Sequence, residues 1–160
     1  MLRVDVLCVG KLKEAYWRDA CAEYQKRLGS FCRLTVTEVE ETRLPDRPSA
    51  AQIAETVNTE GRRLLQKIPQ GAAVIALCIE GKALSSEQLS ASLEGMTVSG
   101  DSRIAFLIGG SHGLSDEVKA SARLKLSMSP MTFPHQLARV MLLEQIYRAM
   151  QIAAGGKYHK

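Results

Sequence analysis

Two loops in the last third of the chain combine residue types that suit ligand binding. An apolar run over residues 103–108 leads into Gly109-Gly110-Ser111-His112-Gly113, and a second run over residues 124–128 leads into Ser129-Pro130-Met131-Thr132-Phe133-Pro134-His135. Loops that leave a strand and open a helix are where α/β proteins build ligand pockets. Because glycine has no Cβ, a ligand can lie against the bare N–H and C=O groups of such a loop. We therefore expect the function to reside near the C-terminal end of the chain.

The glycine loop matches neither common nucleotide motif. No Gly-Lys-Ser or Gly-Lys-Thr follows it, as a Walker A motif requires, and its glycines lack the G-x-G-x-x-G spacing of dinucleotide-binding folds. An ATP-dependent or dinucleotide-dependent enzyme is therefore disfavoured. A tight strand-to-helix turn remains an equal interpretation of these glycines. His112 is a weaker candidate for ligand contact, because histidines are common in exposed loops.

His135 and Arg139 are the cationic pair of the last third. They are four residues apart at the start of a long predicted helix, so they share one face of it. Two such groups beside exposed helix N–H groups favour an anion such as a phosphate or a carboxylate. In the alternative, His135 caps the turn and Arg139 pairs with an acidic neighbour.

The same helix carries an apolar stripe and ends in a basic, aromatic tail. Glu144 and Arg148 are spaced as an ordinary i,i+4 surface pair. The tail Lys157-Tyr158-His159-Lys160 follows Gly155-Gly156, and a ring flanked by lysines suits single-stranded RNA. A disordered, idle tail is the alternative. The apolar stripe indicates packing or an oligomer interface and contains Leu143, Ile146, Tyr147, Met150 and Ala154.

The elements that must position these residues alternate along the chain. Hydrophobic runs predict strands over residues 2–9, 31–39, 71–79, 103–108 and 124–128. Amphipathic spacing predicts helices over residues 12–28, 49–67, from 85 onward, over 115–122, and from 134 to the glycines at 155–156. Glu80-Gly81-Lys82 is predicted to form a turn, and Ser49 and Ser85 each open a capping box. The pattern predicts a three-layer α/β sandwich with a mostly parallel sheet and ligands at the carboxyl ends of its strands.

Composition limits the class of protein. The 160 residues, 46% hydrophobic and 24% charged, predict one globular domain over residues 1–160. No apolar run is long enough to span a bilayer, and Asp5 stands where a signal peptide would be apolar, so we expect a cytoplasmic protein with no membrane partner. The net charge of +4 favours a polyanion such as RNA. The four cysteines have no C-x-x-C spacing and are expected to be buried rather than to form disulfides or a metal site.

Four segments together resemble one known family. They are residues 106–114 (FLIGGSHGL), 126–136 (LSMSPMTFPHQ), 144–149 (EQIYRA) and 158–160 (YHK). Residues 9–17 and 80–82 also look similar, so the likeness spans the chain. The chain resembles the SPOUT-class ribosomal RNA large subunit methyltransferase H family. The resemblance implies a C-terminal trefoil knot with a knotted cofactor-binding part at about residues 71–160, a homodimer with its active site at the interface, S-adenosylmethionine as methyl donor, and methylation of N3 of a pseudouridine in 23S rRNA on the ribosome.

The resemblance also assigns residues. It places the cofactor against Leu77, Gly109, Gly110, Met128, Ser129, Pro130, Met131, Thr132 and Phe133. It places His135, Arg139, Tyr158 and His159 on the substrate side, with Arg139 stabilising charge or contacting phosphate, and the tail residues holding the nucleotide. The proton acceptor stays open, and no metal is needed because the methyl donor is already cationic. The alternatives are a SPOUT methyltransferase that acts on tRNA and a non-catalytic module that binds the ribosome.

Overall fold

All five strands of the protein are parallel, and they lie in the order β2-β1-β4-β3-β5. The structure is a computed structural model that describes residues 1–160. The strands are β1 (Arg3–Val9), β2 (Arg33–Val39), β3 (Ala73–Ala83), β4 (Arg103–Ile108) and β5 (Leu124–Ser127). The helices are α1 (Ala15–Leu28), α2 (Ala50–Lys67), α3 (Ser86–Val98), α4 (Asp116–Ser121) and α5 (His135–Ala153). Strands and helices alternate throughout, as predicted.

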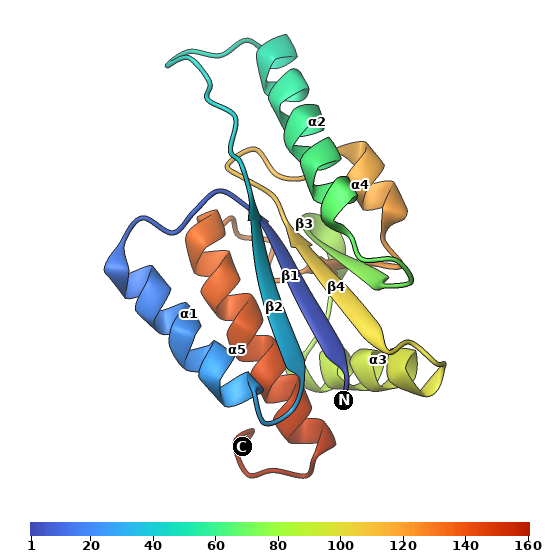
Figure 1. Ribbon diagram of the computed structural model, residues 1–160. Helices are drawn as coiled ribbons and strands as arrows, with labels where there is room; N and C mark the ends of the chain where they lie inside the picture. The colour runs from blue at the N-terminus through green and yellow to red at the C-terminus, as the bar shows by residue number, and fades with distance from the viewer.

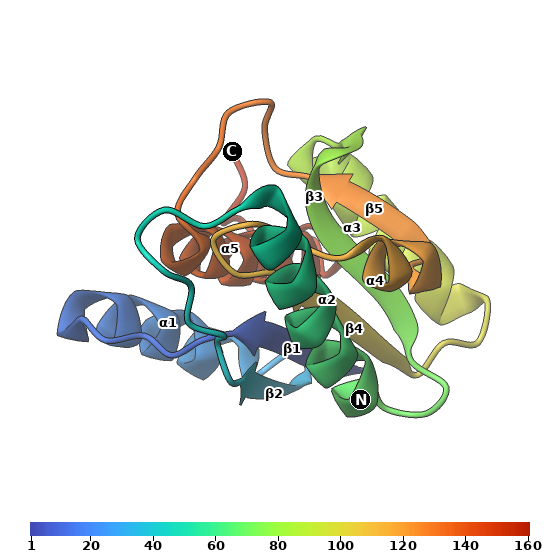
Figure 2. The same cartoon turned by 90° about the horizontal axis from the view of Figure 1, so that it is seen from above.

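Helices cover both faces of the sheet (Figures 1 and 2). Helices α1, α3 and α5 pack on one face around a core that includes Phe106, Leu142 and Ile146. Helices α2 and α4 pack on the other face around a smaller core that includes Leu64 and Val118. The three-layer α/β sandwich expected from the sequence is therefore confirmed, whereas the trefoil knot stays a prediction.

The turn expected at residues 80–82 is wrong, because β3 continues to Ala83. Leu126 of β5 is the register partner of both Leu77 and Lys82, so the residues between them form a bulge in β3. Gly81 makes the bulge possible, since a Cβ there would come within 2.7 Å of the Lys125 carbonyl oxygen. The bulge removes residues 78–81, towards the carboxyl end of β3, from the ladder with β5.

Serine N-caps define where three of the helices begin. Ser49 and Ser85 form complete capping boxes with Gln52 and Gln88, as predicted. Ser115 accepts a hydrogen bond from the backbone N–H of Val118 and caps α4. Helix α1 begins later than expected, at Ala15, because a loop over residues 11–14 follows β1. None of the helices is both long and apolar enough to cross a membrane.

Candidate active site

A cavity of about 790 Å³ opens at the carboxyl ends of β3, β4 and β5. This volume lies within the range of roughly 300–1,000 Å³ that is usual for small-molecule sites. Three segments distant in sequence form most of the cavity lining, namely residues 77–80 of β3, residues 108–114 from the end of β4, and residues between 126 and 138 from β5 to the start of α5, and Lys119 of α4 completes it. The structure therefore brings together both loops selected from the sequence.

Most of the predicted cofactor residues line this cavity. They are Leu77, Gly109, Gly110, Met128, Ser129, Met131, Thr132 and Phe133. Pro130 is not part of the lining, although it lies in the same loop and is exposed. The cavity wall thus combines apolar side chains with glycine backbone, which suits a flat heteroaromatic group with polar edges.

The glycine loop forms its wall by folding tightly on itself. A Cβ on Gly109 would lie 2.5 Å from the backbone of Gly113, and a Cβ on Gly110 would lie 3.2 Å from a carboxylate oxygen of Glu60. Gly113 has a φ of 82°, a backbone conformation that side chains rarely adopt. The tight-turn interpretation is therefore confirmed, and the turn exposes its backbone to the cavity, whereas ligand contact stays a prediction.

The loop before α5 forms the opposite wall. The Ser129 hydroxyl accepts a hydrogen bond of 3.0 Å from the backbone N–H of Met131, while the Ser127 hydroxyl donates one of 3.2 Å to the Ser129 carbonyl oxygen. These bonds hold the turn and leave the Met131 side chain 72% exposed beside the cavity. An apolar side chain so exposed is available for contact with a ligand.

Three polar groups in the cavity lining were not predicted from the sequence. Cys78 and Glu80 lie on the bulge of β3, and Lys119 reaches them from α4. Lys119 forms an ion pair with Glu80, which lowers the pKa of the Glu80 carboxyl group and raises that of the Lys119 ammonium group. Because the bulge could not be recognised from hydrophobic periodicity, Glu80 was expected in a turn.

His135 opens α5 and contributes to the cavity lining. Partial burial lowers the pKa of its imidazole, and the nearby positive charge of Arg139 acts in the same direction against the opposing influence of Glu41. His135 is therefore a neutral imidazole at neutral pH, able to accept a proton at one ring nitrogen and to donate one from the other.

Arg139 does not line the cavity. Its side chain is buried, with one Nη atom 2.7 Å from a Glu38 carboxylate oxygen and the other 3.1 Å from the Gly10 carbonyl oxygen. Its Nε atom is buried and has no hydrogen-bond partner. Arg139 thus ties α5 to the carboxyl ends of β1 and β2, which matches the acidic-neighbour alternative drawn from the sequence.

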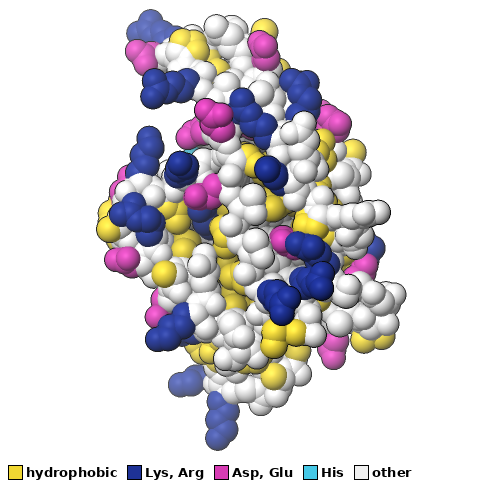
Figure 3. Space-filling model, in the orientation of Figure 1, with side chains coloured by type: hydrophobic (Ala, Val, Ile, Leu, Met, Phe, Trp, Pro, Cys, Tyr) yellow, Lys and Arg dark blue, Asp and Glu magenta, His cyan; other side chains and the backbone are white.

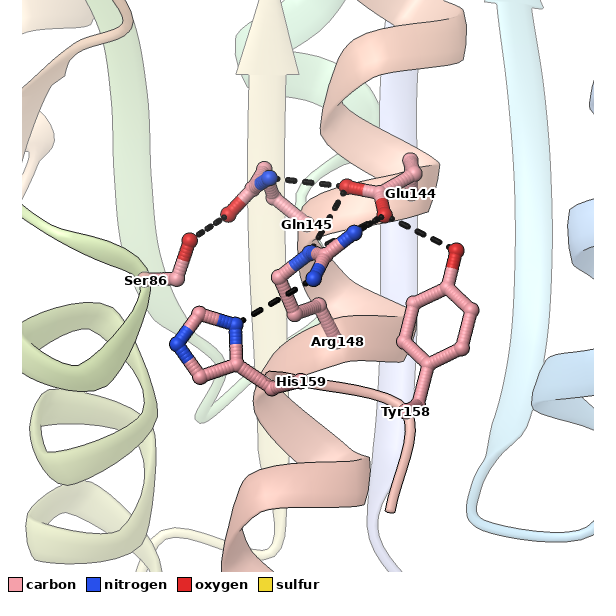
Figure 4. Close-up of polar contacts among 6 residues, drawn as sticks. All are labelled: Ser86, Glu144, Gln145, Arg148, Tyr158 and His159. Carbon is pink, nitrogen blue, oxygen red and sulfur yellow. Dashed lines mark hydrogen bonds and ion pairs between the residues drawn. The ribbon is translucent and has the colours of Figure 1, made fainter. Parts of the chain in front are cut away.

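The C-terminal tail folds back along α5 rather than extending away (Figure 4). The Tyr158 hydroxyl donates a 3.0 Å hydrogen bond to Glu144, and the Arg148 guanidinium lies 4.6 Å from the centre of the Tyr158 ring. His159 lies between Arg148, with its Nδ1 at 3.2 Å, and Glu87 of α3, with its Nε2 at 2.7 Å. Glu144 and Arg148, interpreted from spacing as a simple surface pair, are instead the centre of this network.

The tail network and the cavity occupy different parts of α5. Glu144 follows His135 by nine residues, which corresponds to a rise of about 13 Å and a rotation of about 180° around the helix axis. The predicted substrate-side residues therefore fall into two groups within one chain. His135 lies at the cavity, whereas Tyr158 and His159 are bound further along α5 through Glu144 and Arg148.

Residues 2–159 match the family described as "Predicted SPOUT methyltransferase". The chain belongs to the SPOUT methyltransferase family. Two relatives named "Ribosomal RNA large subunit methyltransferase H", from Streptococcus equi subsp. zooepidemicus and Bifidobacterium animalis subsp. lactis, are each 48% identical to this chain. Each alignment spans 159 residues, which is 99% of this chain and 100% of the relative. The family expected from the sequence motifs is confirmed.

Solved structures share the fold at low sequence identity. A probable methyltransferase from Bordetella pertussis is 14% identical, with a TM-score of 0.57 over 93% of this chain and 96% of the other. The putative methyltransferase Lpg2936 from Legionella pneumophila, solved with bound S-adenosylmethionine, is 15% identical, with a TM-score of 0.51 over 95% of this chain and 66% of the other. Both likenesses support the architecture of this SPOUT methyltransferase.

Proposed function

We propose that the protein transfers the methyl group of S-adenosylmethionine to N3 of a pseudouridine in 23S rRNA. The observation that carries the proposal is the cavity, which is built from the same segments that the family resemblance assigns to the cofactor. The names of the full-length relatives support large-subunit rRNA as the substrate, and the Legionella structure supports the cofactor.

The cavity residues fit this cofactor. Leu77, Met131 and Phe133 supply apolar surface for the adenine, and the backbone of residues 109–110 and 129–132 supplies polar contacts. Tight packing under the glycines supports the fit, because a side chain at Gly109 would force the loop apart. When bound, S-adenosylmethionine supplies a methyl group on a positively charged sulfur, which is already activated for transfer.

The reaction requires the protein to help remove the N3 proton of the substrate base. The N3–CH₃ bond forms as the S–CH₃ bond breaks, and the N3 proton must leave, so the products are the methylated base, S-adenosylhomocysteine and a proton. Charge that develops on the flanking carbonyl oxygens needs stabilisation. His135 is placed to accept the proton because it is neutral and lies at the cavity. Arg139 is one helical turn away, so its positive charge favours an anionic base, while Tyr158 and His159 hold the nucleotide.

A homodimer would reconcile the two groups of substrate-side residues. Because the tail of one chain is bound to Glu144, nine residues along α5 from His135, a second copy can bring its Tyr158 and His159 to the cavity of the first. We place the reaction on the assembled ribosome in the cytoplasm, as the family resemblance implies, and the names of the relatives support large-subunit rRNA as its target. Methylation of tRNA and non-catalytic binding to the ribosome are the competing hypotheses.

Two measurements on one sample test the proposal. Calorimetric titration measures binding of S-adenosylmethionine, and transfer from labelled cofactor is followed to ribosomes that carry or lack the pseudouridine. Binding with transfer only to pseudouridine-bearing ribosomes supports the proposal. Transfer to tRNA alone would contradict the proposed rRNA substrate. If the folded protein did not bind the cofactor, the non-catalytic hypothesis would be favoured.

A further inference from the structure

An exposed aromatic side chain at the start of α1 has no role in the proposed reaction. Tyr16, at the start of α1, is 63% exposed, and its main aromatic contact is the edge of Trp17 at a centroid distance of 5.0 Å. A single exposed aromatic side chain is common on protein surfaces, so its neighbours decide whether it forms a site. Lys11 and Lys13 are exposed in the loop before it and form no ion pair.

The loop that carries these lysines is held in shape. The Arg18 guanidinium donates hydrogen bonds to the carbonyl oxygens of Leu12, at 3.0 Å, and Lys13. A loop fixed by its own backbone presents Lys11, Lys13 and Tyr16 in one arrangement before any partner arrives. Because this loop is already ordered, binding loses less conformational entropy, and more of the interaction free energy contributes to affinity.

The position of this surface relates it to the substrate side of the site. The segment begins immediately after Gly10, whose carbonyl oxygen accepts a hydrogen bond from Arg139. Figure 1 shows the β1–α1 loop and the start of α5 at the same end of the sheet, and Figure 3 shows Lys and Arg side chains on that side of the molecule. We expect a nucleic acid with one base at the cavity to extend over this end of the sheet towards Tyr16.

We propose that Tyr16, with Lys11 and Lys13, forms a stacking platform for an unpaired nucleotide of the RNA substrate. Residues 11–19 contain three basic and two acidic side chains, so charge alone gives this surface little attraction for a duplex backbone. An exposed ring instead stacks on a base that is already out of a helix, with lysines beside it for phosphates. The inference rests on the proposed function, because it assigns this surface to the same RNA.

Trp17 is the only tryptophan in the chain and reports on the platform directly. The probe is a single-stranded oligouridine of about twelve nucleotides, a length within the site size of single-strand binding proteins. We expect saturable quenching of Trp17 fluorescence. Tyr16→Ala should weaken this binding roughly 5- to 150-fold, as loss of one stacked base does, whereas Tyr16→Phe should retain it. In the double variant Lys11→Gln/Lys13→Gln, the slope of the logarithm of the binding constant against the logarithm of the salt concentration should become shallower by about 1.4.

Methyl transfer to large ribosomal subunits provides the second arm. Tyr16→Ala should raise the KM for subunits while the affinity for S-adenosylmethionine stays unchanged, and Val98→Ala, an exposed position on α3, is the control. Equal oligouridine affinity and equal KM in both variants would overturn the platform, as would a change of oligomeric state in Tyr16→Ala. Absence of methyl transfer by the wild type would overturn the proposed function, and Trp17 quenching would still decide the platform.

Discussion

Replacement of Arg139 by alanine tests how much its buried contacts stabilise the fold. The guanidinium is buried and is shared between Glu38 of β2 and the Gly10 carbonyl oxygen after β1. Breaking a fully buried ion pair costs about 3–5 kcal/mol. The Glu38 side chain is 33% exposed, so water can solvate the carboxylate that remains. We therefore expect the free energy of unfolding to fall by about 3 kcal/mol, at the lower end of that range.

Chemical denaturation followed by circular dichroism measures this loss of free energy. Thermal unfolding followed by the same signal gives the melting temperature. For a domain of this size, each kcal/mol shifts the melting temperature by about 2–4 °C, so Arg139→Ala should melt about 6–12 °C below wild type. Arg27→Ala is the matched control, because Arg27 also pairs with a glutamate but both side chains are about half exposed. It should lose no more than about 1 kcal/mol. Equal losses in the two variants would refute the buried-anchor argument.

The same variant separates stability from catalysis. Calorimetry at a temperature where Arg139→Ala is folded should give a wild-type affinity for S-adenosylmethionine, because Arg139 does not line the cavity. Methyl transfer should fall if Arg139 acts on the substrate side. Glu38→Gln weakens the anchor but keeps the guanidinium, so it should retain more transfer than Arg139→Ala. Equal transfer in Arg139→Ala and wild type would remove Arg139 from the substrate side.

Four further predictions concern the cavity and the tail. Gly109→Ala should abolish S-adenosylmethionine binding measured by calorimetry, because the added Cβ would lie 2.5 Å from loop backbone, whereas Gly95→Ala, with open space around it on α3, should bind normally. Burial lowers the pKa of His135, so protonation favours the unfolded chain. The free energy of unfolding should therefore decline as pH falls below about 6.5, its ordinary pKa, and denaturation of His135→Gln should show a flatter profile. Cys78 should be the first of the four cysteines to be alkylated, since the other three are buried, and S-adenosylmethionine should protect it because it lines the cavity; mass spectrometry of the labelled peptides checks both. Tyr158→Ala should leave cofactor affinity unchanged and lower methyl transfer to ribosomes, and unchanged transfer would exclude the tail ring from the reaction.

The sequence predicted the cavity better than it predicted the strand that borders it. The loops at residues 109–113 and 129–134 were recognisable because each follows an apolar run and precedes a helix start, which are local signals. The bulge of β3 was not, because Glu80-Gly81-Lys82 has the composition of a turn. Gly81 is needed instead for the close approach of Lys125 on β5, a strand more than forty residues later. Without the strand order, that neighbour could not be known.

Arg139 illustrates the same limit at the site itself. Its spacing from His135 correctly places both on one face of α5, yet its partner Glu38 is 101 positions away. Helical periodicity reports which side chains share a face, but only the packing of α5 against the ends of β1 and β2 determines what that face meets. The first turn of α5 meets the cavity, Arg139 in the second turn meets the ends of the strands, and Glu144 and Arg148 meet the tail. The sequence therefore contained all the groups proposed for catalysis, while their separation along α5, which is the argument for a second copy at each site, followed only from the structure.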